Sequence, residues 1–258
     1  MSTVIYPSPI FGPIHSRRLG VSLGINLLPA DGKMCSFDCI YCECGYNAAH
    51  RAHLKVPTVQ EVLETLEERL KDMQQNGPKP DVLTFAGNGE PTMHPDFPTI
   101  AEKVAVLRDK YFPEAKISVL SNATRINRED IRQALLHVDN PILKLDTIDG
   151  DYIQLVDRPV GHYDIIEQLH WLEEMGSRII IQTMFMEGTH EGKNVGNCST
   201  AFVNPWLEAL SRIQPRQVMI YTIDRETPSP CLQKASHEQL DWIAEQVRQL
   251  GLEVSVSY

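Results

Sequence analysis

Three cysteines lie close together near the start of the sequence, in the run Cys35-Ser-Phe-Asp-Cys39-Ile-Tyr-Cys42, with the spacing C-x3-C-x2-C. Three neighbouring thiolates can hold one cuboidal iron–sulfur cluster and leave its fourth iron without a protein ligand. That open iron can chelate a small molecule. Structural zinc and unligated reactive thiols are the alternatives. Structural zinc takes four ligands, and no second C-x-x-C or H-x3-H pair accompanies these cysteines.

The remaining cysteines are Cys44, Cys198 and Cys231. None of them forms a further pair with tight ligand spacing beyond Cys42, so the sequence favours one metal site over two. A thiol that donates a hydrogen atom to a radical is a further, weakly supported role for Cys198.

The elements that must position these cysteines alternate between apolar strands and amphipathic helices. Thr58 and Glu61 form a capping box before the first helix, and Ser236 and Gln239 form another before the last. The predicted strands are Val21–Leu28, Val82–Ala86, Ile117–Ser121, Ile142–Leu145, Arg178–Met186, Gln217–Ile223 and Glu253–Ser257. The predicted helices are Thr58–Gln75, Phe97–Lys110, Arg128–Val138, Asp164–Met175, Ala201–Ile213 and His237–Leu250.

This alternation predicts an α/β fold with a parallel sheet. Eight βα units would close a barrel, whereas six make a partial, open (β/α)6 barrel or a doubly wound sheet. No linker interrupts the pattern. We therefore expect a single domain over residues 1–258, with residues 1–20 as a short N-terminal extension and a final C-terminal strand.

Polar residues follow the strands at the edge where active sites of parallel α/β folds lie. The cysteines follow the first strand, and the run GNGEPT at Gly87–Thr92 follows the second. Ser121-Asn122 ends the third strand, Lys144 and Asp146 end the fourth, and Thr222–Glu226 ends the sixth. This shared location supports a site more strongly than any one motif does.

Each of these motifs also has a purely structural interpretation. Gly87–Pro91 fits a simple strand-to-helix turn, Asn122 fits a cap, and Lys144 with Asp146 fits a buried ion pair. Gln182, inside an apolar strand, fits a core hydrogen bond as well as a ligand contact. Further candidate contacts are Arg158, Asp224, Arg225, His190, the N-terminal pair Arg17 and Arg18, and the stretch Glu187–Thr200, expected to be a lid or binding loop.

The net charge of −10 argues against nucleic acid as the main partner without excluding a local basic patch. No apolar run approaches the roughly 20 residues of a membrane span. The first residues lack the apolar core of a signal peptide. These features favour a cytoplasmic protein, in which a disulfide framework is not expected.

The C-x3-C-x2-C run, with Tyr41 just before the last cysteine, resembles the signature of the radical S-adenosylmethionine (SAM) superfamily. The resemblance extends over nearly the whole chain, because that superfamily is built on a partial (β/α)6 barrel with this order of motifs. The runs FGPIHSRRLGVSLGINLLP and CSFDCIYC look similar to the branch of wybutosine-synthesis-like iron–sulfur oxidoreductases.

The resemblance implies that Cys35, Cys39 and Cys42 hold a [4Fe-4S] cluster, and that SAM binds beside it. The residues expected to bind SAM are Tyr41, Gly87, Asn88, Gly89, Glu90, Asn122, Lys144, Asp146 and Gln182. Gly87–Glu90 match the family's GGE-type motif, with Asn at its second position. In that motif, backbone carbonyls bind the SAM amino group, and Glu90 organises the turn.

The implied activity is reductive cleavage of SAM to a 5′-deoxyadenosyl radical, which abstracts hydrogen from a substrate. The electron would come from a flavodoxin or ferredoxin. A small-molecule substrate fits the acidic chain best. Modification of tRNA or a nucleoside, radical activation of a peptide or partner protein, and a non-enzymatic iron–sulfur or zinc protein are the alternatives. No catalytic residue is predicted.

Overall fold

Apolar strands and amphipathic helices alternate along the chain in the computed structural model, which describes residues 4–16 and 19–258. Eight strands form one sheet in the order β1-β2-β3-β4-β5-β6-β9-β11. Their bounds are β1 Ile10–Ser16, β2 Gly20–Ile25, β3 Val82–Phe85, β4 Lys116–Ser121, β5 Asn140–Lys144, β6 Ile180–Met184, β9 Gln217–Tyr221 and β11 Val254–Ser257. All neighbours are parallel except β1 and β2.

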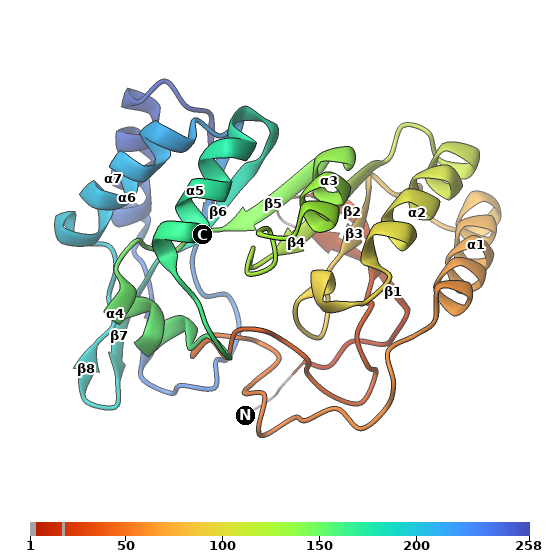
Figure 1. Ribbon diagram of the computed structural model, residues 1–258, viewed down its shortest axis with the longest axis horizontal. Coiled ribbons are helices and arrows are strands. Elements are labelled where there is room, and N and C mark those ends of the chain that lie inside the picture. The colour runs from red at the N-terminus through yellow and green to blue at the C-terminus, as the bar shows by residue number, and fades with distance from the viewer. Residues whose placement is uncertain (1–3, 17–18) are drawn as a thin grey trace.

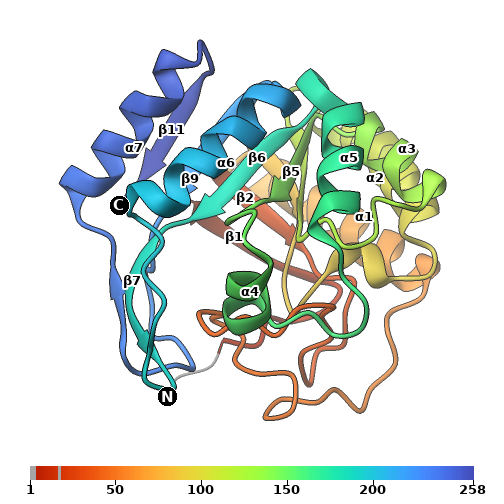
Figure 2. The ribbon, with the colours of Figure 1, turned by 60° about the vertical axis from the view of Figure 1, so that its left-hand side comes forward.

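Six helices connect the parallel strands and lie on the outer face of the curved sheet (Figures 1 and 2). They are α1 Val59–Asn76, α2 Phe97–Tyr111, α3 Glu129–His137, α5 Ile165–Met175, α6 Thr200–Ile213 and α7 His237–Gln249. Both predicted capping boxes are present, at Thr58 and at Ser236. The predicted partial (β/α)6 barrel with a parallel sheet and a C-terminal strand is confirmed.

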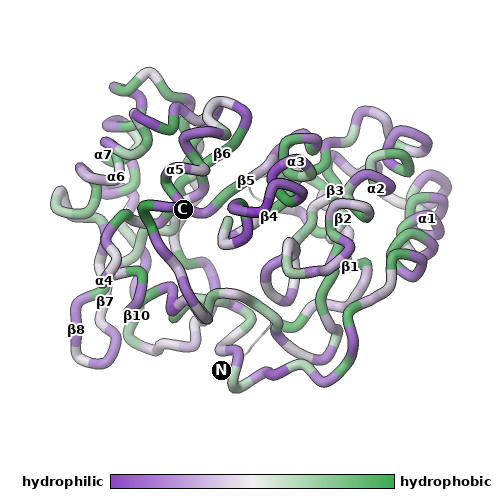
Figure 3. Tube along the Cα trace, viewed as in Figure 1, coloured by the Kyte–Doolittle hydropathy of each residue, from purple (hydrophilic) through white to green (hydrophobic). Residues whose placement is uncertain are grey.

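The main core fills the space between the sheet and these helices. Leu66 and Leu70 of α1 and Trp206 of α6 are almost fully buried against strand residues such as Leu83 and Ile181. Figure 3 shows hydrophobic and hydrophilic residues alternating along the coil of α1, as a helix with one buried face requires. This core fixes the strands, and their carboxyl ends then carry the loops of the site.

Strand β1 lies in residues 1–20, which were predicted to be an N-terminal extension. It pairs antiparallel with β2 and forms one edge of the sheet, with a shift in register between Phe11 and Ile14. Pro13 within it has no N–H for a ladder, and proline is tolerated on an edge strand for that reason. The same proline, with Gly12 beside it, hides the strand from pattern analysis.

Two predictions near residue 186 are wrong. The strand predicted as Arg178–Met186 ends at Met184, because the chain then leaves the main sheet. The stretch expected to be a loop, Glu187–Thr200, contains most of a hairpin made of β7 Met186–His190 and β8 Lys193–Asn194. Glu191 and Gly192 turn the chain with positive φ angles of 50° and 76°. Strand β10, Leu232–Lys234, pairs with β7 to make a small second sheet.

Between β5 and α5 the chain forms a short helical segment, α4 Gly150–Tyr152, followed by one turn of π-helix over Ile153–Asp157. Arg17 and Arg18 lie outside the described residues. Within the described residues, no helix is long and apolar enough to cross a membrane.

Candidate functional site

The loop that carries the cysteines is pinned to the GNGEPT turn after β3. The Met34 amide donates to the Asn88 carbonyl at 2.9 Å, and the Glu90 amide donates to the Met34 carbonyl at 3.2 Å. Gly89 has a φ of 138°, and a Cβ there would lie 1.9 Å from the Met34 oxygen. Glycine is therefore required at this position for the close approach of the two segments. The pairing holds Cys35, which directly follows Met34, beside the turn.

Glu90 joins that turn to the end of β4. Its buried carboxylate accepts from the Thr92 amide at 3.0 Å, the Thr92 hydroxyl at 2.5 Å, the Ser121 hydroxyl at 2.9 Å and the Asn122 amide at 2.6 Å. Burial raises the pKa of Glu90, although these hydrogen bonds oppose the shift. The carboxylate thus organises the turn, as its place in the motif implies.

Asn122 lies beside the first cysteine. Its side-chain amide donates to the Ser36 hydroxyl at 2.9 Å and lies 3.6 Å from the Cys35 sulfur. Its Oδ1 accepts from the Thr124 amide at 3.1 Å. The residue therefore has both the local capping contact and the position near the cysteines that the sequence allowed.

Asn88 faces the N-terminal segment and the chain before the cysteines. Its Nδ2 donates to the Tyr6 carbonyl at 2.9 Å and the Pro29 carbonyl at 2.8 Å, and its Oδ1 accepts from the Tyr6 amide at 2.8 Å. Both polar atoms of the Asn88 side chain are engaged in these hydrogen bonds. The side chain therefore positions the turn and the residues around Tyr6.

Lys144 and Asp146 belong to a buried network with Tyr41 and Asp157. The Lys144 ammonium contacts the Asp146 carboxylate and the Tyr41 hydroxyl, and lies 2.9 Å from Asp157 Oδ1. The Tyr41 hydroxyl also donates to Asp146. Burial alone would lower the pKa of Lys144, but the two carboxylates raise it well above its usual value. The structural ion pair considered from the sequence is present, with a second carboxylate added.

Lys33 places a buried positive charge beside the cysteines. Its ammonium donates to the Gly45 carbonyl at 2.7 Å and lies 3.6 Å from Asp38 Oδ1. Burial would lower its pKa, yet the charges of Cys42, Cys35 and Cys39 and of Asp38 raise it. The side chain is 1% exposed, so this cation is held toward the three thiols.

The three thiols of the cysteine loop match the donor set of a cuboidal cluster that keeps one iron open. A single zinc needs all of its donors about 2.0–2.3 Å away. In a cuboidal cluster each cysteine binds a different iron, so three thiols on one loop suit it without such tight grouping.

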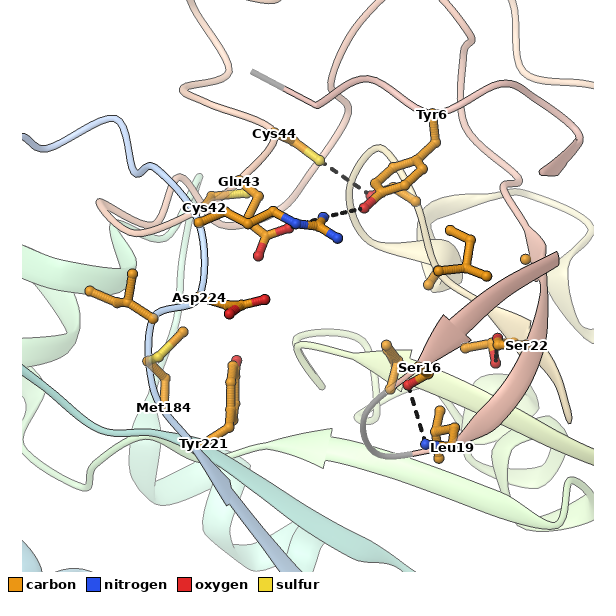
Figure 4. A pocket seen from close by; sticks show the side chains of 18 of the residues that line it. Tyr6, Ser16, Leu19, Ser22, Cys42, Glu43, Cys44, Met184, Tyr221 and Asp224 are labelled. Atoms are coloured by element: carbon orange, nitrogen blue, oxygen red, sulfur yellow. Dashed lines mark hydrogen bonds and ion pairs between the residues drawn. The ribbon is translucent and has the colours of Figure 1, made fainter. Parts of the chain in front are cut away.

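A cavity of about 470 Å³ opens beside the cysteine loop. Figure 4 shows Cys42, Glu43 and Cys44 on one side, Met184, Tyr221 and Asp224 on a second, and Ser16, Leu19 and Ser22 on a third. Tyr41 and Gly87 also line it, and the Cys44 thiol lies 3.5 Å from the Gly87 carbonyl. Cys42 and the GNGEPT turn therefore line the same cavity.

Arg225 links three segments in the wall of this cavity. Its guanidinium donates to Glu43 Oε2 at 2.8 Å and to the Tyr6 hydroxyl at 3.1 Å. The Val4 amide donates to the Glu43 carbonyl at 3.0 Å. The loop after β9, the cysteine loop and the N-terminal segment thus meet here, and Asp224 lines the cavity beside them as the sequence suggested.

Several sequence candidates lie elsewhere. Gln182 is half-buried in β6, opposite Lys144 in β5, and does not line this cavity. Arg158 lies 3.5 Å from Asp38 and over the Tyr46 ring. The His190 ring contacts the Ser229 hydroxyl at 3.0 Å. Cys198 is buried with its thiol 3.6 Å from the Met186 carbonyl, and Cys231 is exposed. Neither cysteine lines the cavity.

The wall contributed by β1 and the segment before it was not predicted from the sequence. Phe11, Ile14, His15 and Tyr6 line the cavity, and the Tyr6 and Phe11 rings lie 4.6 Å apart. The apolar residues at positions 10, 11 and 14 were a usable signal for an edge strand, but the prolines obscured it.

Comparison with known proteins agrees with this geometry. The family model described as Radical SAM superfamily matches residues 31–193. A UPF0026 protein of Methanocaldococcus jannaschii is 36% identical over 159 residues, which are 60% of this chain and 45% of that protein.

Solved structures share the fold. The structure of Streptococcus suis SuiB bound to S-adenosylmethionine aligns with a TM-score of 0.64 at 14% identity, covering 90% of this chain and 50% of that one. A structure of TYW1 with a lysine-pyruvate adduct bound aligns with a TM-score of 0.62 at 15% identity, covering 88% of this chain and 73% of that one. The chain thus spans about half the length of the M. jannaschii relative and of SuiB.

Proposed function

This chain belongs to the radical SAM superfamily, and from that premise we propose that it is an enzyme in which Cys35, Cys39 and Cys42 hold a [4Fe-4S] cluster beside a SAM site. When bound, the cluster supplies one electron to the sulfonium of SAM, which releases methionine and a 5′-deoxyadenosyl radical. That radical would abstract a hydrogen atom from a small molecule bound in the cavity.

The observation that carries this proposal is the shared cavity of Cys42 and Gly87, held in place by the pairing of Met34 with Asn88 and Glu90. Backbone carbonyls of the turn would then bind the amino group of SAM beside a cluster held by the cysteines. Asn122 and Lys33 hold the cysteine loop from its other sides.

The size and walls of the cavity support a small-molecule substrate. A volume of about 470 Å³ is in the range of small-ligand pockets, roughly 300–1,000 Å³. Residues of strand β1 line one side, and the Arg225–Glu43–Tyr6 contacts join the segments that line another. These walls restrict the room left beside SAM and exclude water from a reactive radical.

The test is anaerobic reconstitution with iron and sulfide, followed by addition of SAM and dithionite. We expect 5′-deoxyadenosine from the wild type and none above background from Cys42→Ala. Cys231→Ala is the matched control, because that thiol is exposed and outside the cavity, and it should retain the wild-type yield. A fully loaded wild-type cluster that leaves SAM intact contradicts the proposal and favours a non-enzymatic iron–sulfur protein.

The substrate class is tested by the same product. Small molecules, peptides and tRNA are each added, and the yield of 5′-deoxyadenosine is compared with the yield without substrate. We expect an increase with a small molecule. An increase with tRNA alone would instead favour nucleoside modification, and an increase with a peptide would favour radical activation of a partner.

The physiological electron donor that we propose is a flavodoxin or ferredoxin. Such proteins deliver single electrons at low potential, which the cleavage requires, and no second redox centre is needed in this chain.

A further inference from the structure

An exposed stretch beside the cysteine loop carries positive charge in a chain whose net charge is −10. We call residues 50–55, His-Arg-Ala-His-Leu-Lys, the basic strip. No Asp or Glu occurs between Glu43 and Glu61. Arg51, His53 and Lys55 are exposed, and Leu54 is 61% exposed.

The basic strip is attached directly to the chain that leads into the cysteines. The Lys33 amide donates to the His50 carbonyl at 2.6 Å, and Lys33 pairs with Arg51 in a parallel bridge. A Cβ on Gly32 would lie 2.4 Å from the His50 oxygen, so the two backbones are in close contact. Cys35 is two residues from Lys33, which places its Cα at most about 7.6 Å from that of Lys33.

The two permanent charges of the basic strip, on Arg51 and Lys55, are not neutralised by neighbouring carboxylates. In the described part of the chain, no acidic side chain forms an ion pair with Arg51 or Lys55. Cations on the outer helices differ in this respect, since Lys110 pairs with Glu67 and Arg128 pairs with Asp130.

Asp31 contacts the backbone of the strip. Its carboxylate accepts from the His53 amide at 2.9 Å and from the Leu54 amide at 3.1 Å. These contacts hold the backbone of the strip and leave the two cationic side chains in solvent.

We propose that the basic strip is the docking surface for an electron-transfer protein with an acidic face, which passes its electron to the cluster. The inference rests on the proposed function. Unpaired surface cations speed the encounter with an acidic partner, and the exposed Leu54 between them offers an apolar contact. Transient redox complexes use small interfaces, below about 1,200 Å², which suits a strip of six residues.

Nucleic acid fits this surface less well. Phosphate binding rests on many cations along a face, whereas the strip has two permanent positive charges with a leucine beside them. The acidic redox protein is therefore the occupant that charge and position favour.

The experiment uses the reconstituted protein and a reduced flavodoxin as the probe. Arg51→Glu/Lys55→Glu is compared with the matched double variant Lys79→Glu/Lys103→Glu, whose lysines are exposed in the turn before β3 and on α2. Both variants change the net charge equally. Stopped-flow absorbance gives the second-order rate of cluster reduction at low and high salt, and dithionite reduction checks that each cluster is intact.

We expect the strip variant to be reduced by flavodoxin at least about tenfold more slowly at low salt, with a weaker salt dependence. The control variant should stay within about twofold of wild type, and dithionite should reduce all three. Equal rates in the two variants would overturn the inference. So would unchanged flavodoxin kinetics together with lost tRNA binding, which would make the strip a nucleic-acid surface. Failure of dithionite-reduced wild type to cleave SAM would instead refute the proposed function.

Discussion

Lys144 lies between two buried carboxylates, and removing its charge tests what that network does. In Lys144→Met, Asp146 and Asp157 are left buried without their cation. Breaking one side of a buried ion pair costs about 3–5 kcal/mol. We expect a loss of that size in the free energy of unfolding, measured by urea denaturation at neutral pH. A loss below about 1 kcal/mol would contradict a structural role and favour a role in binding SAM.

The pH dependence of that loss follows from Asp157. Burial raises the pKa of Asp157 to about 6 even though Lys144 lowers it, and Asp146 adds to the rise. Without Lys144 the folded-state pKa rises further above the ordinary value of 3.8. The protonated carboxyl needs no cation, so the penalty is absent at low pH and grows as pH rises through the folded-state pKa. The variant should therefore lose more stability at pH 8 than at pH 5.

At the scale of elements, the pairing of the cysteine loop with the turn after β3 depends on Gly89. In Gly89→Ala the new Cβ would overlap the Met34 carbonyl, 1.9 Å away. We expect the variant to lose several times more stability than Gly251→Ala and to bind little iron on reconstitution. Gly251 also has a positive φ, 76°, but nothing lies within 4 Å of its Cβ position, so its change costs about 1–2 kcal/mol. Equal iron content in both variants would refute the role given to the pairing.

The elements that local patterns encode were predictable. Apolar runs and capping residues mark the parallel strands and their helices, and the cysteines and GNGEPT stand at strand ends in the sequence itself. Strand β1 was obscured by Pro13, although the apolar residues at positions 10, 11 and 14 were a usable signal. The β7–β8 hairpin was not predicted, because its residues are mostly polar and its further partner, β10, lies about 40 residues later in the chain. The network around Lys144 was half predictable, since Asp157 joins it from the π-helical turn.

At the scale of the whole molecule, Arg225 connects the loop after β9 to the cysteine loop and to Tyr6. The contacts are largely exposed, so Arg225→Ala should change the free energy of unfolding by less than about 1 kcal/mol. It should speed hydrogen exchange in residues 4–9 and 43–46, measured by mass spectrometry. Arg212→Ala, which removes an exposed ion pair with Glu173 on the outer helices, is the control. Unchanged hydrogen exchange in those segments would show that Arg225 does not stabilise the contacts between the N-terminal segment and the cysteine loop.

The central claim is that one site unites a cluster on Cys35, Cys39 and Cys42 with SAM on the adjacent turn. The most direct measurement is the EPR spectrum of the reduced, reconstituted protein before and after SAM is added. We predict about four irons per chain and a reduced-cluster signal whose g values change on adding SAM, with no such signal in Cys42→Ala. A colourless protein with one zinc, or a cluster signal that SAM leaves unchanged, would contradict the claim.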